Sequence, residues 1–271
     1  MEYIELQDEK IPALGFGTWQ LTGEDCVEGV ETALELGYRH IDTAQIYENE
    51  EEVGQGLQNS EVDREDIWLT TKVWRDRLNT EDLKASVEES LEKLQTEYVD
   101  LLLIHWPFEE MNLEAVLQEM DELVEEGKVN HIGISNFTLE QMEEAQKLSD
   151  HDLLTNQVEY HPFLDQKEVL EKCSEHEMML TAYSPLARGD VIGNETLEEI
   201  SERHGKSEVQ VALRWLIQQD NVAAIPKATS RDHIEQNLHI FDFELSDEEM
   251  ETISELARRD RKVDPDFGPW D

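Results

Sequence analysis

The sequence predicts a closed (β/α)8 barrel, the TIM-barrel fold, with an N-terminal β-hairpin and an extra C-terminal helix and tail. Short apolar segments alternate with amphipathic helical ones along the chain, which is typical of parallel strands joined by helices. Eight strand–helix units of about 30 residues each indicate a closed barrel. An open doubly wound sheet is the alternative, but no G-x-G-x-x-G follows the first strand.

The predicted strands are short and rich in aliphatic and β-branched residues. The hairpin comprises Tyr3–Leu6 and Ile11–Ala13. The barrel strands are Leu14–Trp19, a short strand from His40, Ile67–Trp74, Val99–Trp106, Val129–Ser135, Thr155–Tyr160, Met179–Leu186 and Val222–Pro226.

The predicted helices place apolar residues on one face. Leu83, Val87, Leu91 and Leu94, for example, recur at helical spacing after Thr80, which we expect to cap their helix. The others are Glu24–Leu36, Asn49–Leu57, Leu113–Glu126, Leu139–Leu148, Gln166–His176, Thr196–His204, Ser207–Gln219, Arg231–Leu238 and, as the extra helix, Asp247–Ala257. No Pro-, Gly- or Ser-rich linker interrupts the series, so we expect a single domain over residues 1–271.

The chain is strongly acidic. It has 65 Asp and Glu against 22 Lys and Arg, a formal net charge of −43. This charge excludes a nucleic-acid-binding surface, since the phosphate backbone needs cations. It also repels itself unless salt screens it, over about 3 Å at 1 M. We therefore interpret the composition as adaptation to a salty cytoplasm, as in halophiles.

The N-terminal residues contain no signal-like apolar run, and no segment approaches the roughly 20 apolar residues of a membrane span. A soluble cytoplasmic protein is therefore expected. Cys26 and Cys173 lie in helical patterns, so we expect reduced structural thiols. The nine histidines form no H-E-x-x-H or related cluster, and no metal site is predicted.

Polar residues follow three consecutive predicted strands. Asp42 and Tyr47 follow the second, Lys72 lies near the end of the third, and His105 near the end of the fourth. Each alone has a structural explanation, such as a salt bridge or a satisfied core histidine. Because barrel active sites lie at the C-terminal ends of the strands, their joint placement indicates an active site.

The four side chains suit the reduction of a carbonyl group. A phenol has an ordinary pKa of about 10, and we expect the ammonium group of Lys72 to lower the pKa of Tyr47 so that it can donate a proton. Asp42 would pair with Lys72 and keep it charged. His105 would hydrogen-bond the carbonyl oxygen and orient it.

Several motifs resemble those of the aldo-keto reductases. They are G-F-G-T-W at 15–19, D-T-A-x-x-Y-x-N-E at 42–50, T-K-V-W at 71–74, L-I-H-W-P at 103–107 and I-P-K-A at 225–228. The resemblance matches the tetrad of that family to Asp42, Tyr47, Lys72 and His105. The short loop after His105 and the tail D-P-D-F-G-P-W resemble the prokaryotic branch that includes diketogluconate reductases.

The resemblance implies a nicotinamide cofactor across the barrel mouth. Ser135, Asn136 and Gln157 would bind its carboxamide, and Tyr183 would stack on the nicotinamide unless it only packs in the core. The pyrophosphate would lie along Ser184, Leu186 and Ala187, where backbone amides can donate to oxygens. The remaining cofactor-binding positions are Lys227, Ala228, Thr229, Ser230, which would cap the following helix, His233 and Asn237.

One position departs from the family pattern. His233 stands where NADP-specific members commonly carry arginine, whose guanidinium group is the better partner for a 2′-phosphate. Arg231 is nearby but should point elsewhere on its helix. We therefore expect NADPH to bind through Lys227 and NADH to be accepted as well.

Trp19, Trp74 and Trp106 are the expected walls of a pocket for a small-molecule carbonyl substrate, with the tail near Phe267 and Trp270 as its lid. These aromatic residues would also fit simple packing at the barrel end. The family resemblance implies a monomer.

Two alternatives remain open. The protein could be a catalytically silent, nucleotide-sensing subunit of the same fold, although the intact tetrad argues against this. It could also be a barrel hydrolase with paired carboxylates, such as Asp42 and Glu159, although Lys72 would then have no role.

Overall fold

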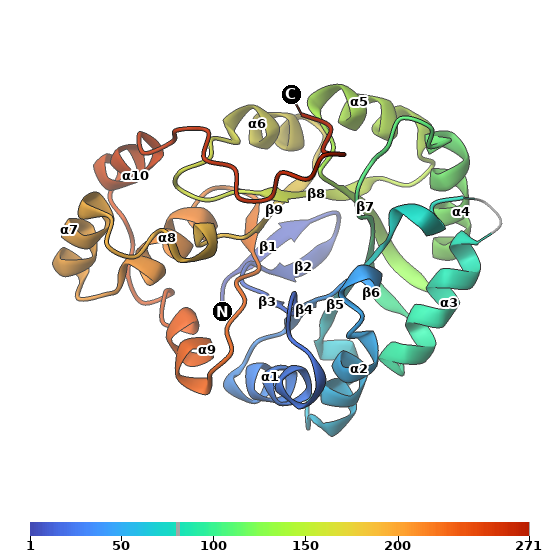
Figure 1. The fold of residues 1–271 in the computed structure, drawn as a ribbon, viewed down its shortest axis with the longest axis horizontal. Helices are drawn as coiled ribbons and strands as arrows, with labels where there is room; N and C mark the ends of the chain where they lie inside the picture. Colours follow the sequence, from blue (N-terminus) through green and yellow to red (C-terminus); the bar gives the residue numbers. More distant parts are fainter. Residues whose placement is uncertain (80–81, 271) are drawn as a thin grey trace.

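The chain folds into a ring of parallel strands wrapped by helices (Figure 1), the (β/α)8 barrel that the sequence predicts. The computed structural model describes residues 1–79 and 82–270. Within these residues, eight parallel strands pair in chain order from β3 to β10. They are β3 (Phe16–Gly17), β4 (His40–Asp42), β5 (Trp68–Val73), β6 (Val99–Ile104), β7 (Val129–Ser135), β8 (Leu153–Glu159), β9 (Met179–Tyr183) and β10 (Val222–Ala224).

The ring closes between its first and last strands. Leu14 and Ala224 form a parallel bridge, and the N–H of Gly17 donates to the carbonyl oxygen of Pro226 at 3.1 Å. A Cβ atom on Gly17 would lie only 2.7 Å from the carbonyl oxygen of Ile225, so the two segments can approach this closely only because this residue is glycine. The fold is therefore a closed barrel and not an open doubly wound sheet.

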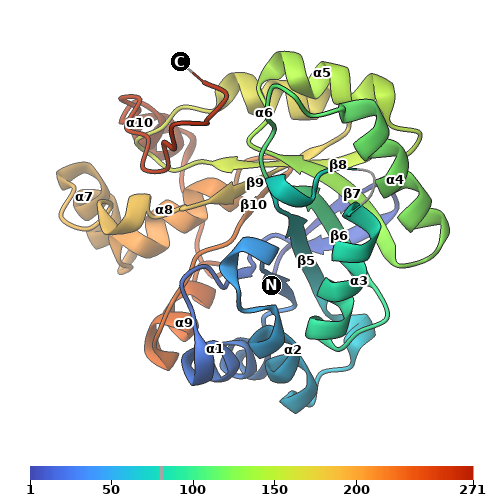
Figure 2. The ribbon, with the colours of Figure 1, turned by 45° about the vertical axis from the view of Figure 1, so that its right-hand side comes forward.

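Helices cover the outside of the ring, and Figure 2 shows α3, α4 and α5 beside β5, β6 and β7. The helix that contains Leu83 and Leu94 buries both side chains, as its apolar spacing predicts, whereas its expected cap, Thr80, lies outside the described residues. The helices are α1 (Gly23–Leu36), α2 (Glu50–Asn59), α3 (Leu83–Leu94), α4 (Leu113–Glu125), α5 (Leu139–Leu148), α6 (Lys167–Glu175), α7 (Glu195–His204), α8 (Glu208–Ile217), α9 (Arg231–Leu238) and α10 (Asp247–Ser254). Short 3-10 turns are η1 (Gln45–Tyr47), η2 (Arg64–Asp66), η3 (Arg75–Arg77) and η4 (Ala187–Gly189).

Some elements are shorter than predicted. The strand expected over Leu14–Trp19 is regular only over Phe16–Gly17, and the last barrel strand ends at Ala224. Pro226 has no N–H to donate to a neighbouring strand, which favours an early end. The extra helix ends at Ser254, and the chain beyond it is irregular.

The N-terminal hairpin, β1 (Tyr3–Leu6) and β2 (Glu9–Pro12), lies at the N-terminal end of the barrel, in the centre of the ring in Figure 1. The Gln7 side-chain amide donates to the carbonyl oxygen of Glu177, just before β9, at 3.2 Å. The hairpin therefore covers the N-terminal end of the barrel and leaves the C-terminal end uncovered.

The inner strands are buried on both sides. Every residue of β5 and of β8 is buried, as expected for parallel strands between a barrel core and a helical layer. Lys72 lies within β5 and is 0% exposed. A charge at such a position requires partners from neighbouring strands.

Among the residues described, none of the helices has the length and apolarity needed to span a lipid bilayer.

Candidate active site

A cavity of about 670 Å³ lies at the C-terminal ends of the strands. Its polar side chains come from successive strands of the barrel, and its rim is aromatic. The predicted site residues that line it are Asp42, Tyr47, His105, Asn136, Gln157, Tyr183, Ser184, Leu186, Lys227, Trp19, Trp74, Trp106 and Phe267.

A buried ion pair between Lys72 and Asp42 lies at the base of the site, where Asp42 lines the cavity and Lys72 is buried behind it. Lys72 Nζ lies 2.5 Å from Asp42 Oδ1, and it also donates to the carbonyl oxygen of Thr43 at 2.7 Å. Its third contact is the Tyr47 hydroxyl at 3.4 Å. The predicted pairing of Asp42 with Lys72 is confirmed, and Tyr47 lies beside this pair.

Local structure explains how Tyr47 reaches this pair. β4 ends at Asp42 and pairs with β5, which carries Lys72. Tyr47 ends the short turn η1, and Gln45 in the same turn holds it in place. The Gln45 amide donates to Ser86 Oγ at 3.1 Å and accepts the N–H of Trp74 at 3.0 Å, which ties the turn to α3 and to the end of β5.

His105 follows β6 and faces Tyr47 and Trp74 edge-on, with ring centroids 5.7 and 5.2 Å away. Burial, together with the nearby positive charge of Lys72, holds its pKa well below the ordinary value for histidine. The ring is therefore neutral near pH 7. Its buried Nδ1 atom has no hydrogen-bond partner among residues 1–79 and 82–270.

The pKa of Tyr47 differs from the expectation. We expected Lys72 to lower it, but burial raises the pKa of the Tyr47 hydroxyl well above 10, and the negative charge of Asp42 raises it further. The expectation is wrong chiefly because the hydroxyl is buried. In addition, Asp42 Oδ1 lies 0.9 Å closer to the ammonium group than the phenol does (2.5 against 3.4 Å), so its charge offsets that of Lys72. Tyr47 therefore carries its proton at neutral pH.

The residues predicted to bind a carboxamide form a connected group at the ends of β7, β8 and β9. The Tyr183 hydroxyl donates to Asn136 Oδ1 at 2.7 Å, and Asn136 Nδ2 donates to Ser135 Oγ at 3.0 Å. Ser135 is buried behind the cavity wall and donates to the carbonyl oxygen of Gln157. Gln157 Nε2 donates to Asp42 at 2.8 Å, which connects this group to the ion pair.

The loop after β9 bends through left-handed backbone. Ser184, Ala187 and Arg188 have φ angles of 47°, 47° and 57°, and Gly189 follows at 102°. Turns of this kind expose backbone N–H groups and can bind anions. Arg188, which is not among the predicted residues, also lines the cavity and lies 5.1 Å from the ring of Trp19. The sequence could have indicated this residue, because Arg188 closely follows a predicted barrel strand in a chain with few cations.

The predicted residues after β10 differ in whether they line the cavity. Lys227 lines the cavity and is exposed, and in the part of the chain described it forms no ion pair. Ser230 caps α9 by accepting the N–H of His233, as predicted. Arg231 points away and pairs with Glu35 of α1 at 2.7 Å. Five predicted positions of this segment lie outside the cavity lining: Ala228 and Asn237, which are buried, and Thr229, Ser230 and His233, which are exposed.

The tail lies over the cavity. Phe267 packs edge-on against Trp74 and Trp106, at centroid distances of 6.1 and 5.4 Å. Trp270 packs on Trp106 at 5.2 Å without lining the cavity. Val263 and Pro265, which are not among the predicted residues, also line the cavity. No periodic pattern in the irregular tail could have identified them.

The structure argues against the hydrolase alternative. Glu159 does not line the cavity, and its carboxylate accepts hydrogen bonds from the backbone of the tail and from His161. It is therefore unable to act with Asp42 as a pair of carboxylates on one substrate.

Asp42, Tyr47 and His105 line the cavity, and Lys72 contacts two of them from behind it. This arrangement in a (β/α)8 barrel is that of barrel enzymes with the active site at the C-terminal ends of the strands. The model of the Aldo/keto reductase family matches residues 13–258, and the chain belongs to that family. It is an oxidoreductase that reduces carbonyl groups.

Relatives are similar over almost the whole chain. A glyoxal reductase of Bacillus subtilis is 42% identical, with 94% of this chain and 92% of the relative covered. A methylglyoxal reductase of Escherichia coli O157:H7 is 40% identical, with coverage of 96% and 99%. A crystal structure described as a putative 2,5-diketo-D-gluconic acid reductase B is 47% identical, covers 100% of this chain and 98% of its own, and has a TM-score of 0.98.

Proposed function

We propose that the protein reduces small aldehydes and ketones to alcohols with NADPH, that it also accepts NADH, and that Tyr47 donates the proton. The observation that carries this proposal is the buried group in which the Tyr47 hydroxyl lies 3.4 Å from Lys72 Nζ. The reaction is reversible, so Tyr47 accepts the proton back when an alcohol is oxidised.

The chain's own residues handle the proton. Because its pKa is raised, Tyr47 keeps its proton until negative charge develops on the carbonyl oxygen of the substrate. Lys72 then stabilises the phenolate that remains, and Asp42 holds the ammonium group in place. Neutral His105 orients the carbonyl oxygen without adding a second positive charge to the site.

The cavity fits a nicotinamide dinucleotide. Asn136 and Gln157 present amide groups, Tyr183 presents a ring, and the left-handed loop after β9 lines the cavity with Ser184, Leu186 and Arg188. Lys227 and Arg188 form no ion pairs within the described residues, although the protein carries a net charge of −43. Cations left free of carboxylates support an anionic ligand here. When bound, the reduced nicotinamide supplies the hydride.

The cofactor preference depends on the start of α9. Lys227, the exposed Thr229 and the N-terminus of α9 suit a 2′-phosphate. His233 lacks the fork of donors that an arginine would offer, and Arg231 is occupied by Glu35. We therefore propose a relaxed preference for NADPH over NADH. Measuring kcat/KM for both would check this, and a preference for NADPH of several hundredfold would contradict it.

The names of two relatives support 2-oxoaldehydes as the substrate class, and the aromatic walls at Trp19, Trp74 and Trp106 suit such small carbonyls. Similarity to a putative 2,5-diketo-D-gluconic acid reductase B supports placing the chain in the diketogluconate reductase branch. We further propose a monomeric, cytoplasmic, single-domain enzyme of a halophile, the last from its net charge.

Tyr47→Phe tests the proposed function. The variant should reduce 4-nitrobenzaldehyde and methylglyoxal at least a hundredfold more slowly, since a positioned proton donor contributes about 10²–10⁴-fold. Its affinity for NADPH, followed by quenching of tryptophan fluorescence, should remain unchanged. Undiminished turnover would contradict the role of Tyr47. NADPH binding without turnover by the native protein would favour the silent nucleotide-sensing subunit.

A further inference from the structure

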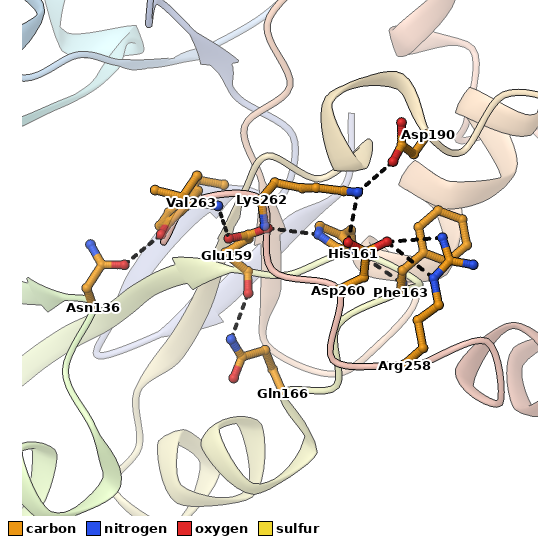
Figure 3. Close-up of polar contacts among 11 residues, drawn as sticks. Asn136, Glu159, His161, Phe163, Gln166, Asp190, Arg258, Asp260, Lys262 and Val263 are labelled. Atoms are coloured by element: carbon orange, nitrogen blue, oxygen red, sulfur yellow. Dashed lines mark hydrogen bonds and ion pairs between the residues drawn. The ribbon is translucent and has the colours of Figure 1, made fainter. Parts of the chain in front are cut away.

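One buried carboxylate connects the C-terminal tail to the barrel. Glu159 ends β8, and its side chain is fully buried. Its Oε1 atom accepts the N–H of Lys262 at 2.5 Å, and its Oε2 atom accepts the N–H of Val263 at 2.8 Å (Figure 3). A carboxylate removed from water needs such donors, and two consecutive residues of the tail provide them.

The turn after β8 fixes the direction of this carboxylate. His161 is fully buried, and its Nδ1 atom accepts the N–H of Phe163 at 3.2 Å. Its proton therefore sits on Nε2, which donates to Glu159 Oε1 at 3.0 Å. The Gln166 side chain donates to the Glu159 carbonyl oxygen at 2.7 Å. Although burial opposes ionisation, the hydrogen bonds from His161 and the tail hold the pKa of Glu159 below its ordinary value.

The ion pairs of the tail are more exposed to solvent. Lys262 Nζ bridges Asp190, in the loop after η4, and Asp260 at 2.5 and 2.9 Å (Figure 3). The Asp190 side chain is 54% exposed, so salt screens this pair. The contact at Glu159 lies out of water, so salt weakens it less than this ion pair.

The wall of the cavity begins at this contact. Val263, which donates to Glu159, itself lines the cavity, as do Pro265 and Phe267. Phe267 then packs against Trp74 and Trp106. The position of Val263 therefore sets the position of the wall that follows.

We propose that Glu159 is a positioning residue for the carbonyl substrate, because it holds Lys262 and Val263 so that the segment Val263–Phe267 forms the substrate wall. This role rests on the proposed carbonyl reduction in the same cavity. Glu159 touches neither the cavity nor the reacting atoms, and it acts through the backbone of the tail.

Glu159→Gln tests this role, since an amide group presents an N–H to one of the two backbone donors and loses one of the two bonds. The KM for 4-nitrobenzaldehyde should rise at least fivefold, with kcat within twofold and the Kd for NADPH unchanged. Amide hydrogen exchange at Lys262 and Val263 should be at least tenfold faster. The control Glu143→Gln makes the same chemical change on α5, at a half-exposed carboxylate that pairs with Lys172. It should leave the KM, kcat, the Kd for NADPH and amide exchange at Lys262 and Val263 unchanged.

A second variant acts from the side of the tail. Val263→Pro removes the N–H that Glu159 accepts without changing the barrel, so it tests the contact even if Glu159→Gln fails to fold. It should raise the KM for 4-nitrobenzaldehyde in the same way. In a double-mutant cycle, Glu159→Gln and Phe267→Ala should raise this KM less than multiplicatively, because both act on one wall.

Three results would overturn the proposal: a lower kcat at unchanged KM in Glu159→Gln, unchanged exchange at Lys262 and Val263, or multiplicative effects in the cycle. Amide exchange requires no turnover, so it reports on this contact even if the proposed function fails. Tyr47→Phe should lose turnover while keeping native exchange at both amides, which distinguishes the two failures.

Discussion

Replacing Asp42 with asparagine should destabilise the protein severely. Lys72 is 0% exposed, and without the Asp42 carboxylate its ammonium group keeps only neutral acceptors, such as the Thr43 carbonyl oxygen at 2.7 Å and the Tyr47 hydroxyl at 3.4 Å. Removing one partner of a buried pair costs about 3–5 kcal/mol. Lys72 can instead lose its proton, which from an ordinary pKa of about 10.4 costs about 4.6 kcal/mol at pH 7. Whether Lys72 keeps or loses its proton, the free energy of unfolding should therefore fall by about 3–5 kcal/mol.

Urea denaturation at constant KCl measures this loss. A domain is stable by about 5–15 kcal/mol, so Asp42→Asn should unfold at a much lower urea concentration. Reductase activity should fall as well, because Lys72 would no longer be held charged beside Tyr47.

The double variant Asp42→Asn/Lys72→Met sharpens the test. With both charges of the pair removed, neither member is left buried without its partner, and the double variant should regain most of the lost stability without regaining activity. A loss below about 1 kcal/mol in Asp42→Asn, or a double variant no more stable than the single one, would refute this account of the pair.

Three further predictions concern pH, cofactor and salt. His105 stays neutral in the folded protein but binds a proton near pH 6.5 in the unfolded chain, so the free energy of unfolding should fall as the pH drops below about 6.5. In urea denaturation at pH 5.5, His105→Asn should remove about 1.4 kcal/mol of that loss. His233→Arg should raise the ratio of kcat/KM for NADPH over NADH about tenfold, through a charge-assisted hydrogen bond to the 2′-phosphate, and an unchanged ratio would place that phosphate elsewhere. Lowering KCl from about 1 M to 0.1 M lengthens screening from about 3 to 10 Å, so helical circular dichroism should be lost without denaturant, and a fold indifferent to salt would refute the halophilic interpretation.

Much of the fold could be predicted because strands and helices leave different periodicities. The fully buried strands β5 and β8 are apolar and β-branched over most of their length, and α3 repeats Leu83, Val87, Leu91 and Leu94 at helical spacing. Ends of elements were harder, as in the strand predicted over Leu14–Trp19, because backbone pairing with β10 and β4, and not composition, decides where β3 is regular.

The site could be predicted in part for a geometric reason. Parallel strands in a barrel place their carboxyl ends at one end, so polar residues such as Asp42 and His105 near those ends must lie close together. The direction of the Tyr47 pKa could not be predicted, because it depends on depth of burial and on the 0.9 Å by which Asp42 is nearer to Lys72.

The barrel and the acidic composition follow from the sequence by itself, through local pattern and residue counts, and the strand ends together with the family motifs predict Asp42, Tyr47, Lys72 and His105 as one group. Only the tertiary structure decided what Glu159 does. Its sequence position at a strand end was compatible with a catalytic carboxylate, yet its oxygens are bound by backbone N–H groups 103 and 104 residues further along the chain. Backbone donors look the same in every sequence, so the partner of a buried carboxylate becomes known only when the chain is folded.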